Sequence, residues 1–202
     1  VAACLPQAPG VLRTEYPSED DLKVGGARTN HVRIISPRYE KVCIGIDDTD
    51  TKTEGATWVM ALKCVEACRM DGAEFLNMRL IQLNPAVPNK TTNCVSSALN
   101  FAVRPNKIPW LLESVRSFVE ENTFSKDTGI ACYHGIQDFS HAAISRQVKT
   151  EILTREQAER EAELLGIEFL DRNAGKGRIG ALGAVLWGNR GTEAAGLYGE
   201  HL

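Results

Sequence analysis

The sequence predicts a layered α/β or α+β domain in which helices pack on a mixed sheet. Short runs rich in apolar and β-branched residues alternate along the chain with longer stretches whose apolar residues recur at helical spacing. Clusters of Gly and Pro separate these stretches. Alternating strands and helices form layered domains, and 202 residues suffice for one good-sized core or for a core plus an appendage.

Residues 1–40 are turn-rich and polar, and we expect them to form an irregular N-terminal lead-in. One short strand is predicted within them, over Val32–Ile35. The chain begins without Met and without the basic segment of a signal peptide. We therefore expect this chain to be a fragment of a longer protein.

The pattern becomes regular after residue 40, and we expect one domain over residues 41–190. Its first half should contain three strands, at Lys41–Ile46, Phe75–Leu83 and Cys94–Val103. A helix is expected over Ala56–Met70, because apolar residues recur on one side of it and Asp71-Gly72 follows. Prolines at 85 and 88 exclude a helix between residues 84 and 90, which should form a loop.

The second half of the domain should contain two helices and three shorter strands. One helix begins near Pro109, since proline is common at the first helical position. The other begins after Thr154, which forms a capping box with Gln157, and it should end at Gly166. The strands are predicted at Ile130–Tyr133, Val148–Leu153 and Ile167–Leu170. Residues 134–147 should form a linker with a helical turn, Ala181–Trp187 should pack inside, and residues 191–202 should form a flexible tail.

Three carboxylates follow the first predicted strand of this domain, in the run Ile44-Gly45-Ile46-Asp47-Asp48-Thr49-Asp50. Carboxylates this close repel one another unless a cation or a proton neutralises them. Oxygen ligands at a strand end, followed by a Gly-containing loop and a helix, favour a site for Mg²⁺ and phosphate. An isolated pair of aspartates would instead be typical of a helix N-terminus, where the helix dipole favours negative charge. The third carboxylate favours the metal site, with Asp47, Asp48 and Asp50 as candidate ligands and catalytic groups.

Three further segments supply groups that suit a phosphate. Gly55-Ala56-Thr57 precedes a predicted helix whose first N–H groups can bind an anion, although alone it is an ordinary helix cap. A rigid loop carries an amide, a cation and a hydroxyl at Asn84, Lys90 and Thr91. Residues 175–180 are rich in glycine, which suits close approach of the backbone to a ligand. The candidate nucleotide-binding residues are Gly55, Asn84, Lys90, Thr91, Gly175, Gly177, Arg178 and Gly180, and Thr57 is a candidate catalytic hydroxyl.

The composition limits the classes of partner. The formal net charge is −3, and no basic run interleaved with aromatic residues indicates a nucleic-acid surface. No stretch approaches the roughly 20 apolar residues needed to span a membrane. The six cysteines include no Cys-x-x-Cys pair, and Cys64 and Cys68 share one face of a predicted helix, which favours small core residues over metal ligands. Free thiols are expected, as in a cytoplasmic protein.

Three separated motifs carry a resemblance to a known family. They are the acidic run, Leu83-Asn84-Pro85-x-x-Pro88-x-Lys90-Thr91, and Gly177-x-Ile179-Gly180-Ala181-Leu182. Over residues 41–188 the chain resembles the N-terminal kinase-like domain of archaeal tRNA 2-agmatinylcytidine synthetase. Two segments depart from that family: Lys90-Thr91-Thr92-Asn93-Cys94-Val95 stands in place of Lys-Thr-Arg-Gly-Asn-Gly, and Glu54-Gly55-Ala56-Thr57-Trp58 in place of Gly-Met-Cys-Thr-Thr. With these variants the chain is more similar still to methanogenesis marker protein 11.

The resemblance implies a domain that uses ATP and Mg²⁺ to transfer a phosphoryl group to an oxygen of an acceptor. In the synthetase, agmatine then displaces the phosphate from a tRNA cytidine. The implied metal ligands are Asp47 and Asp48, with Asp50 as a supporting carboxylate or base. The implied phosphate contacts are Lys90 and Arg178, and Thr57 would be a hydroxyl contact or a phosphate acceptor.

Two other classes of function stay open from the sequence. One is a nucleotide-binding accessory protein in methanogenesis that does not turn ATP over, which the loss of the arginine and glycines after Lys90 favours. The other is an RNA-binding protein, which the negative net charge disfavours. Any tRNA would be bound through domains that these 202 residues do not contain.

Overall fold

The computed structural model describes residues 8, 10–23, 26, 28–88, 90–136 and 138–199. The chain divides into two compact units, Val1–Tyr39 and Glu40–Leu202. In the first unit, β1 (Arg13–Glu15) pairs antiparallel with β2 (Arg33–Ile35), and a short 3-10 helix, η2 (Glu19–Leu22), lies between them in sequence. The strand expected over Val32–Ile35 is thus confirmed, and it belongs to a two-stranded antiparallel sheet. The sequence missed β1 because three residues give too short an alternation to recognise.

The second unit contains a five-stranded sheet with the order β4-β5-β3-β6-β7. Every neighbouring pair in it is antiparallel. The strands are β3 (Glu40–Asp47), β4 (Ala73–Gln82), β5 (Val95–Val103), β6 (Gly129–His134) and β7 (Glu168–Phe169). The layered fold of sheet and helices is therefore confirmed, and its strands pair antiparallel throughout. β3 lies at the centre, which explains its unbroken apolar run.

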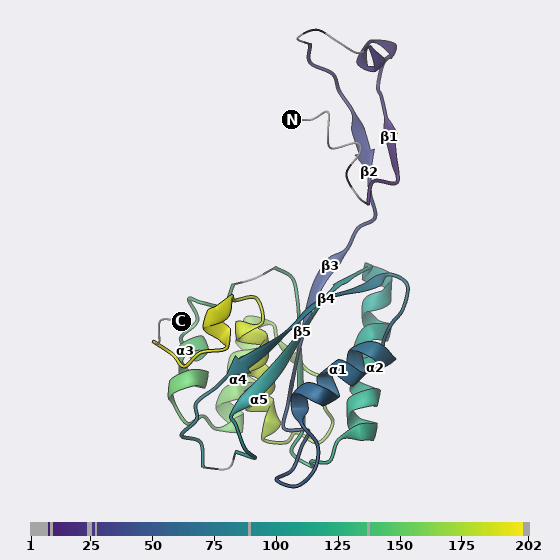
Figure 1. Ribbon diagram of the computed structural model, residues 1–202. Coiled ribbons are helices and arrows are strands. Elements are labelled where there is room, and N and C mark those ends of the chain that lie inside the picture. The colour runs from purple at the N-terminus through teal and green to yellow at the C-terminus, as the bar shows by residue number, and fades with distance from the viewer. Residues whose placement is uncertain are drawn as a thin grey trace. The chain divides into compact units, whose positions relative to one another are not determined.

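Helices cover both faces of this sheet (Figure 1). On one face α1 (Thr57–Ala67) and α2 (Ile108–Asn122) share a core with alternate side chains of β3, including Ile44 and Ile46. On the other face α3 (Ala143–Thr150), α4 (Arg155–Leu165) and α5 (Gly177–Trp187) form a second core. Two further 3-10 turns are η3 (Pro105–Lys107) and η4 (Thr192–Ala194). None of the helices in the described part of the chain is long and apolar enough to cross a membrane.

The glycine-rich stretch is helical, which corrects the expectation of a ligand-cradling loop. Three of its glycines, Gly177, Gly180 and Gly183, lie within α5. None of the four glycines at 175, 177, 180 and 183 has a positive φ. Their role is close packing, because a Cβ at Gly177 would lie 2.5 Å from the backbone nitrogen of Gly129. Small residues let this helix approach β3 and β6 closely, which is a packing role that the sequence did not predict.

One strand predicted in the second half of the chain does not form, and the C-terminal segment makes contacts that the sequence did not predict. The strand expected over Val148–Leu153 does not form, because α3 continues to Thr150 and the next residues form the connection to α4. The tail expected to be flexible after residue 190 packs against α3 in its described part. There the ammonium of Lys149 donates to the carbonyls of Glu193, Ala194 and Gly196 at 3.3, 3.0 and 2.8 Å. These contacts join segments that are distant in sequence, so no local sequence pattern predicts them.

The capping signals of the sequence are confirmed in detail. The hydroxyl of Thr154 accepts from the backbone of Gln157, and the Gln157 side chain accepts from the backbone of Thr154. Gly166 ends α4 in the left-handed conformation, with φ 68°. Pro109 lies in the first turn of α2.

Candidate functional site

A cavity of about 980 Å³ opens where β3 ends, and most of the predicted site residues line it. Its walls come from the acidic turn after β3, the first turn of α1, the loop before β5, the α3–α4 connection and the first turn of α5. The predicted residues that line it are Asp47, Asp48, Asp50, Gly55, Thr57, Asn84, Lys90, Thr91, Gly177 and Gly180. Gly175 and Arg178 do not line it. Segments far apart in sequence therefore meet at one strand end, as the combined motifs predicted.

Asp47 is the last residue of β3, and its carboxylate lies against the first turn of α5. A Cβ built at Gly180 would fall 1.6 Å from Oδ2 of Asp47, so only glycine leaves room for this carboxylate. Burial raises the pKa of Asp47 well above its ordinary value, and the charge of Asp48 raises it further. Neutralising this carboxylate with a proton or a cation is therefore strongly favoured.

Asp48 faces charges of both signs. Burial is the main cause of a rise in its pKa to about 6. The carboxylates of Asp127 and Asp50 contribute to this rise, whereas the ammonium of Lys176 opposes it. Its backbone has φ 56°, a left-handed conformation that aspartate and asparagine tolerate better than most residues. Strain of this kind gathers at functional sites. Asp48 therefore lies among other carboxylates with one opposing ammonium, an arrangement that favours the neutral form of its carboxyl.

Replacing Asp48 by asparagine should stabilise the metal-free protein at pH 7. Between about pH 4 and pH 6 the folded chain holds a proton on Asp48 that the unfolded chain has released, because the folded pKa is about 6 rather than 3.8. The free energy of unfolding of the wild type should fall as the pH rises through this range. The Asp48→Asn variant should lose that part of the fall. Thermal unfolding in EDTA from pH 4 to 7 measures it, and equal pH dependence in both proteins would contradict the expectation.

Asp127 lines the cavity although the sequence pattern did not single it out, and Lys176 of the glycine-rich stretch lines it as well. A signal for Asp127 exists, because β6 runs antiparallel to β3 and pairs Gly129 with Asp47. The residues just before β6 must then lie beside the end of β3. The hydroxyl of Thr128 also donates to the backbone oxygen of Asp48 at 3.0 Å, so this segment braces the acidic turn.

Thr57 connects the acidic turn to α1. Its hydroxyl donates to Oδ1 of Asp50 at 3.1 Å and accepts from the backbone and side chain of Thr49, both at 3.2 Å. The residue is 6 % exposed, so its oxygen is enclosed by these partners. Thr57 therefore orients Asp50, and its predicted part as hydroxyl contact or phosphate acceptor stays a prediction.

The loop before β5 is held by the residues that were expected to contact a nucleotide. The amide nitrogen of Asn84 donates to the backbone oxygen of Glu151 at 2.9 Å, and its amide oxygen accepts from the backbone of Ala86 at 2.9 Å. The ammonium of Lys90 donates to the backbone oxygen of Pro85 across the loop. Asn84 thus shapes the cavity wall, and Lys90 remains exposed at its rim.

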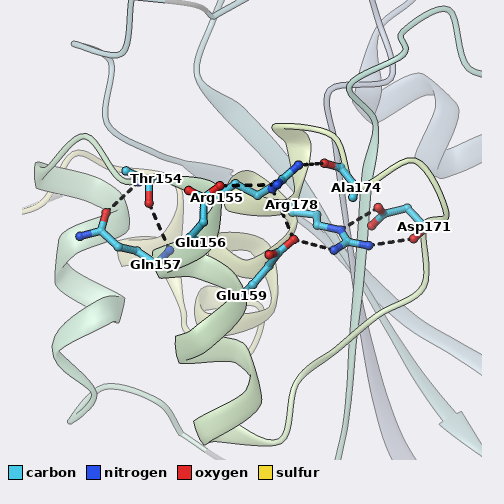
Figure 2. A network of polar contacts seen from close by, with 8 residues as sticks. All are labelled: Thr154, Arg155, Glu156, Gln157, Glu159, Asp171, Ala174 and Arg178. Atoms are coloured by element: carbon cyan, nitrogen blue, oxygen red, sulfur yellow. Dashed lines mark hydrogen bonds and ion pairs between the residues drawn. The ribbon is translucent and has the colours of Figure 1, made fainter.

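Arg178 is part of the fold rather than of the cavity wall, which corrects its predicted position (Figure 2). Its guanidinium donates to Oδ2 of Asp171 at 2.8 Å, to the backbone oxygen of Asp171 at 3.0 Å, and to Glu159 at 2.7 Å. Asp171 in turn accepts from the backbone of Ile130 at 3.0 Å. This network ties α4, α5 and β6 together, and it holds the guanidinium of Arg178 against Asp171 and Glu159, outside the cavity lining.

Ala174 should be replaceable by glycine with a gain in stability. It lies between Asp171 and α5 with φ 49°, where an alanine Cβ is strained and glycine is not. The Ala174→Gly variant should raise the free energy of unfolding by about 1 kcal/mol, as measured by urea denaturation. The matched control is Ala195→Gly, because Ala195 has φ −82° and should lose stability. A loss in both variants would contradict the assignment of strain to Ala174.

The donor set fits a magnesium ion that shares its shell with phosphate. Among the described residues, no group of three or more His, Cys, Asp or Glu side chains is arranged to hold a metal ion alone. Magnesium is usually held by one or two carboxylates, with waters and substrate phosphates completing the shell. Asp47 and Asp48 offer two hard oxygen ligands at a position where positive charge is favoured. The thiols of Cys64 and Cys68 lie 3.8 Å apart and buried in the α1 core, as expected of core residues.

Comparisons with known proteins give one consistent relation. The family description TiaS TCKD domain matches residues 43–108. An uncharacterized protein of Methanocaldococcus jannaschii is 39% identical over 165 residues, which cover 81% of this chain and 55% of that protein. The tRNA 2-agmatinylcytidine synthetase TiaS of Thermococcus sibiricus is 34% identical over 156 residues, or 72% of this chain and 35% of the synthetase. The chain therefore spans about half of the first relative and about a third of the second.

Solved structures show the same fold. The crystal structure of TiaS in complex with tRNA and ATP matches 73% of this chain with a TM-score of 0.64 and 24% identity, and 36% of that chain is covered. The complex of TiaS with tRNA, AMPCPP and agmatine matches 72% of this chain with a TM-score of 0.62 and 23% identity, with 36% of that chain covered. At this identity the likeness concerns the fold. The chain is thus similar in sequence and in fold to part of a tRNA-modifying enzyme.

Proposed function

We propose that the cavity at the end of β3 binds ATP with Mg²⁺ and transfers its terminal phosphoryl group to an oxygen of an acceptor. The observation that carries the proposal is the partly buried acidic pair, Asp47 and Asp48, in the lining of a cavity large enough for a nucleotide. Similarity to TiaS, whose solved complexes contain ATP or AMPCPP, supports the same ligand here.

The charge and position of each residue suggest its role in this reaction. Asp47 and Asp48 would hold Mg²⁺, which when bound neutralises charge on the phosphates and on the two carboxylates. Asp50, oriented by Thr57, lies beside them as an acceptor for a proton from the attacking hydroxyl. Lys176 and Lys90 line the cavity as ammonium partners for phosphate oxygens. Catalysis would rest on positioning and charge stabilisation, as is usual in phosphoryl transfer.

Calorimetric titration of ATP tests the proposal, in Mg²⁺ and in EDTA, for the wild type and for Asp48→Asn. The wild type should bind ATP more tightly with Mg²⁺, and the variant should show the same weak binding in both buffers. Asp71→Asn is the matched control, because Asp71 is an exposed aspartate whose side chain is 85% accessible and does not line the cavity. Failure of the wild type to bind ATP in Mg²⁺ would refute the proposal.

A second candidate is a cytoplasmic accessory protein of methanogenesis that binds the nucleotide without turning it over. The observation that favours it is the segment Thr92-Asn93-Cys94, which lines the cavity without a cationic side chain. Release of phosphate from [γ-³²P]ATP separates the two candidates. An enzyme should release or transfer phosphate when tRNA or another hydroxyl-bearing acceptor is added, and an accessory protein should bind ATP with no release under any of these conditions.

A further inference from the structure

The cavity has an excess of negative charge that an anionic nucleotide must overcome. Its carboxylates are Asp47, Asp48, Asp50, Glu54, Asp127, Glu151 and Glu156, whereas its cations are Lys52, Lys90, Arg155 and Lys176. The arginine expected at the cavity, Arg178, is bound to Asp171 and Glu159 outside it. Among the described residues, one arginine does line the cavity, and its guanidinium offers a fork of donors matched to phosphate oxygens.

That residue is Arg155, the first residue of α4 (Figure 2). Its guanidinium donates to the backbone oxygen of Ala174 at 2.9 Å. Ala174 lies two residues before Lys176, which lines the same cavity as Asp48. Arg155 is therefore anchored on the same cavity wall as the ammonium that faces the acidic strand end.

The other contacts of Arg155 leave its donors available. Its pairs with Glu156 and Glu159 are both 3.5 Å long, which is the outer limit of a hydrogen bond. Its side chain is 43% exposed, against 16% for Arg178. Glu159 instead forms a short ion pair with Arg178, at 2.7 Å. Its carboxylate is therefore already paired and does not bind Arg155 closely. An exposed guanidinium with one short hydrogen bond can exchange weak partners for a phosphate at little cost.

We propose that Arg155 is a phosphate-binding residue of the cavity and contacts the triphosphate of the bound nucleotide. The proposal rests on the proposed function, since it assumes ATP in the cavity. The fork geometry of arginine gives two donors to one phosphate, which a lysine cannot reproduce.

Calorimetry with two probes tests this assignment: ATP with Mg²⁺, and adenosine, which carries no phosphate. Arg155→Gln should weaken ATP binding by roughly 10- to 100-fold, as expected for a lost charged hydrogen bond, and leave adenosine binding unchanged. Arg155→Lys should fall between the wild type and Arg155→Gln. The matched control is Arg160→Gln, because Arg160 is an exposed arginine of the same helix, outside the cavity, with one pair at 3.7 Å.

The outcomes separate the two proposals. If the wild type binds ATP and Arg155→Gln binds it equally well, the assignment of Arg155 is overturned and the nucleotide site stands. An equal loss of ATP and adenosine would also overturn it, because Arg155 would then only shape the cavity wall. If the wild type binds no ATP, both proposals fall together.

Discussion

The Gly180→Ala variant should lose magnesium-dependent ATP binding while keeping its fold. The new Cβ would lie 1.6 Å from Oδ2, 2.4 Å from Cγ and 2.9 Å from Cβ of Asp47. Because Asp47 is fixed in β3, its carboxylate would have to leave its position. We expect a loss of about 100-fold in affinity for ATP with Mg²⁺, equal to about 2.7 kcal/mol.

The stability of that variant should change much less than its affinity. The overpacked methyl costs about 1–3 kcal/mol, and alanine recovers about 1 kcal/mol of helix propensity relative to glycine. Gly183→Ala is the matched control in the same helix, because its Cβ first meets the flexible end of the Leu83 side chain, at 2.7 Å. Calorimetry and urea denaturation of both variants measure the two effects. Full affinity in Gly180→Ala would show that the position of Asp47 is irrelevant to the site.

Arg178→Met should be the most destabilising of these substitutions, at about 3–5 kcal/mol. The carboxylate of Asp171, whose side chain is 2% exposed, would lose its partner and remain charged in the interior. Its remaining contact is the backbone N–H of Ile130, which does not neutralise it. Urea denaturation gives the free energy of unfolding.

A second substitution separates the ion pair from packing. In the Arg178→Met background, Asp171→Asn removes the unpaired charge and should recover more than about 1 kcal/mol. Arg160→Met is the control for losing an exposed arginine pair and should cost less than about 1 kcal/mol. A cost below that value for Arg178→Met would mean that the network in Figure 2 does not hold α4, α5 and β6 together.

The sequence predicted the elements whose signals are local. Each of three signals acts within a few residues and is found where it was expected. They are the apolar run before Asp47, the capping box at Thr154 and the proline at 109. Glycine serves two needs, close approach to a ligand and close approach to another backbone, and the sequence pattern does not separate them. The structure shows the close packing of Gly177 against Gly129, and it also places Gly177 and Gly180 in the cavity lining, so their contact with a nucleotide stays a prediction.

The predictions for the site residues also succeeded where the signal was local and failed where it was not. The acidic run and the loop at Lys90 were predicted to meet, and the structure brings both to one cavity. Arg178 was assigned to phosphate because a charged residue beside glycines resembles an anion site, and its partner Glu159 lies 19 residues away on another helix. Asp127 and Arg155 were missed because they reach the cavity through strand pairing and helix packing, which a single motif does not encode.

The most direct test of the central claim is a crystal structure of the full chain with Mg²⁺ and a non-hydrolysable ATP analogue. We expect the metal roughly 2.1 Å from a carboxylate oxygen of Asp47 or Asp48, with the triphosphate between Lys176 and the loop at Thr91. The guanidinium of Arg155 should then contact a phosphate oxygen. A nucleotide bound elsewhere, or a metal with no contact to either aspartate, would contradict the account.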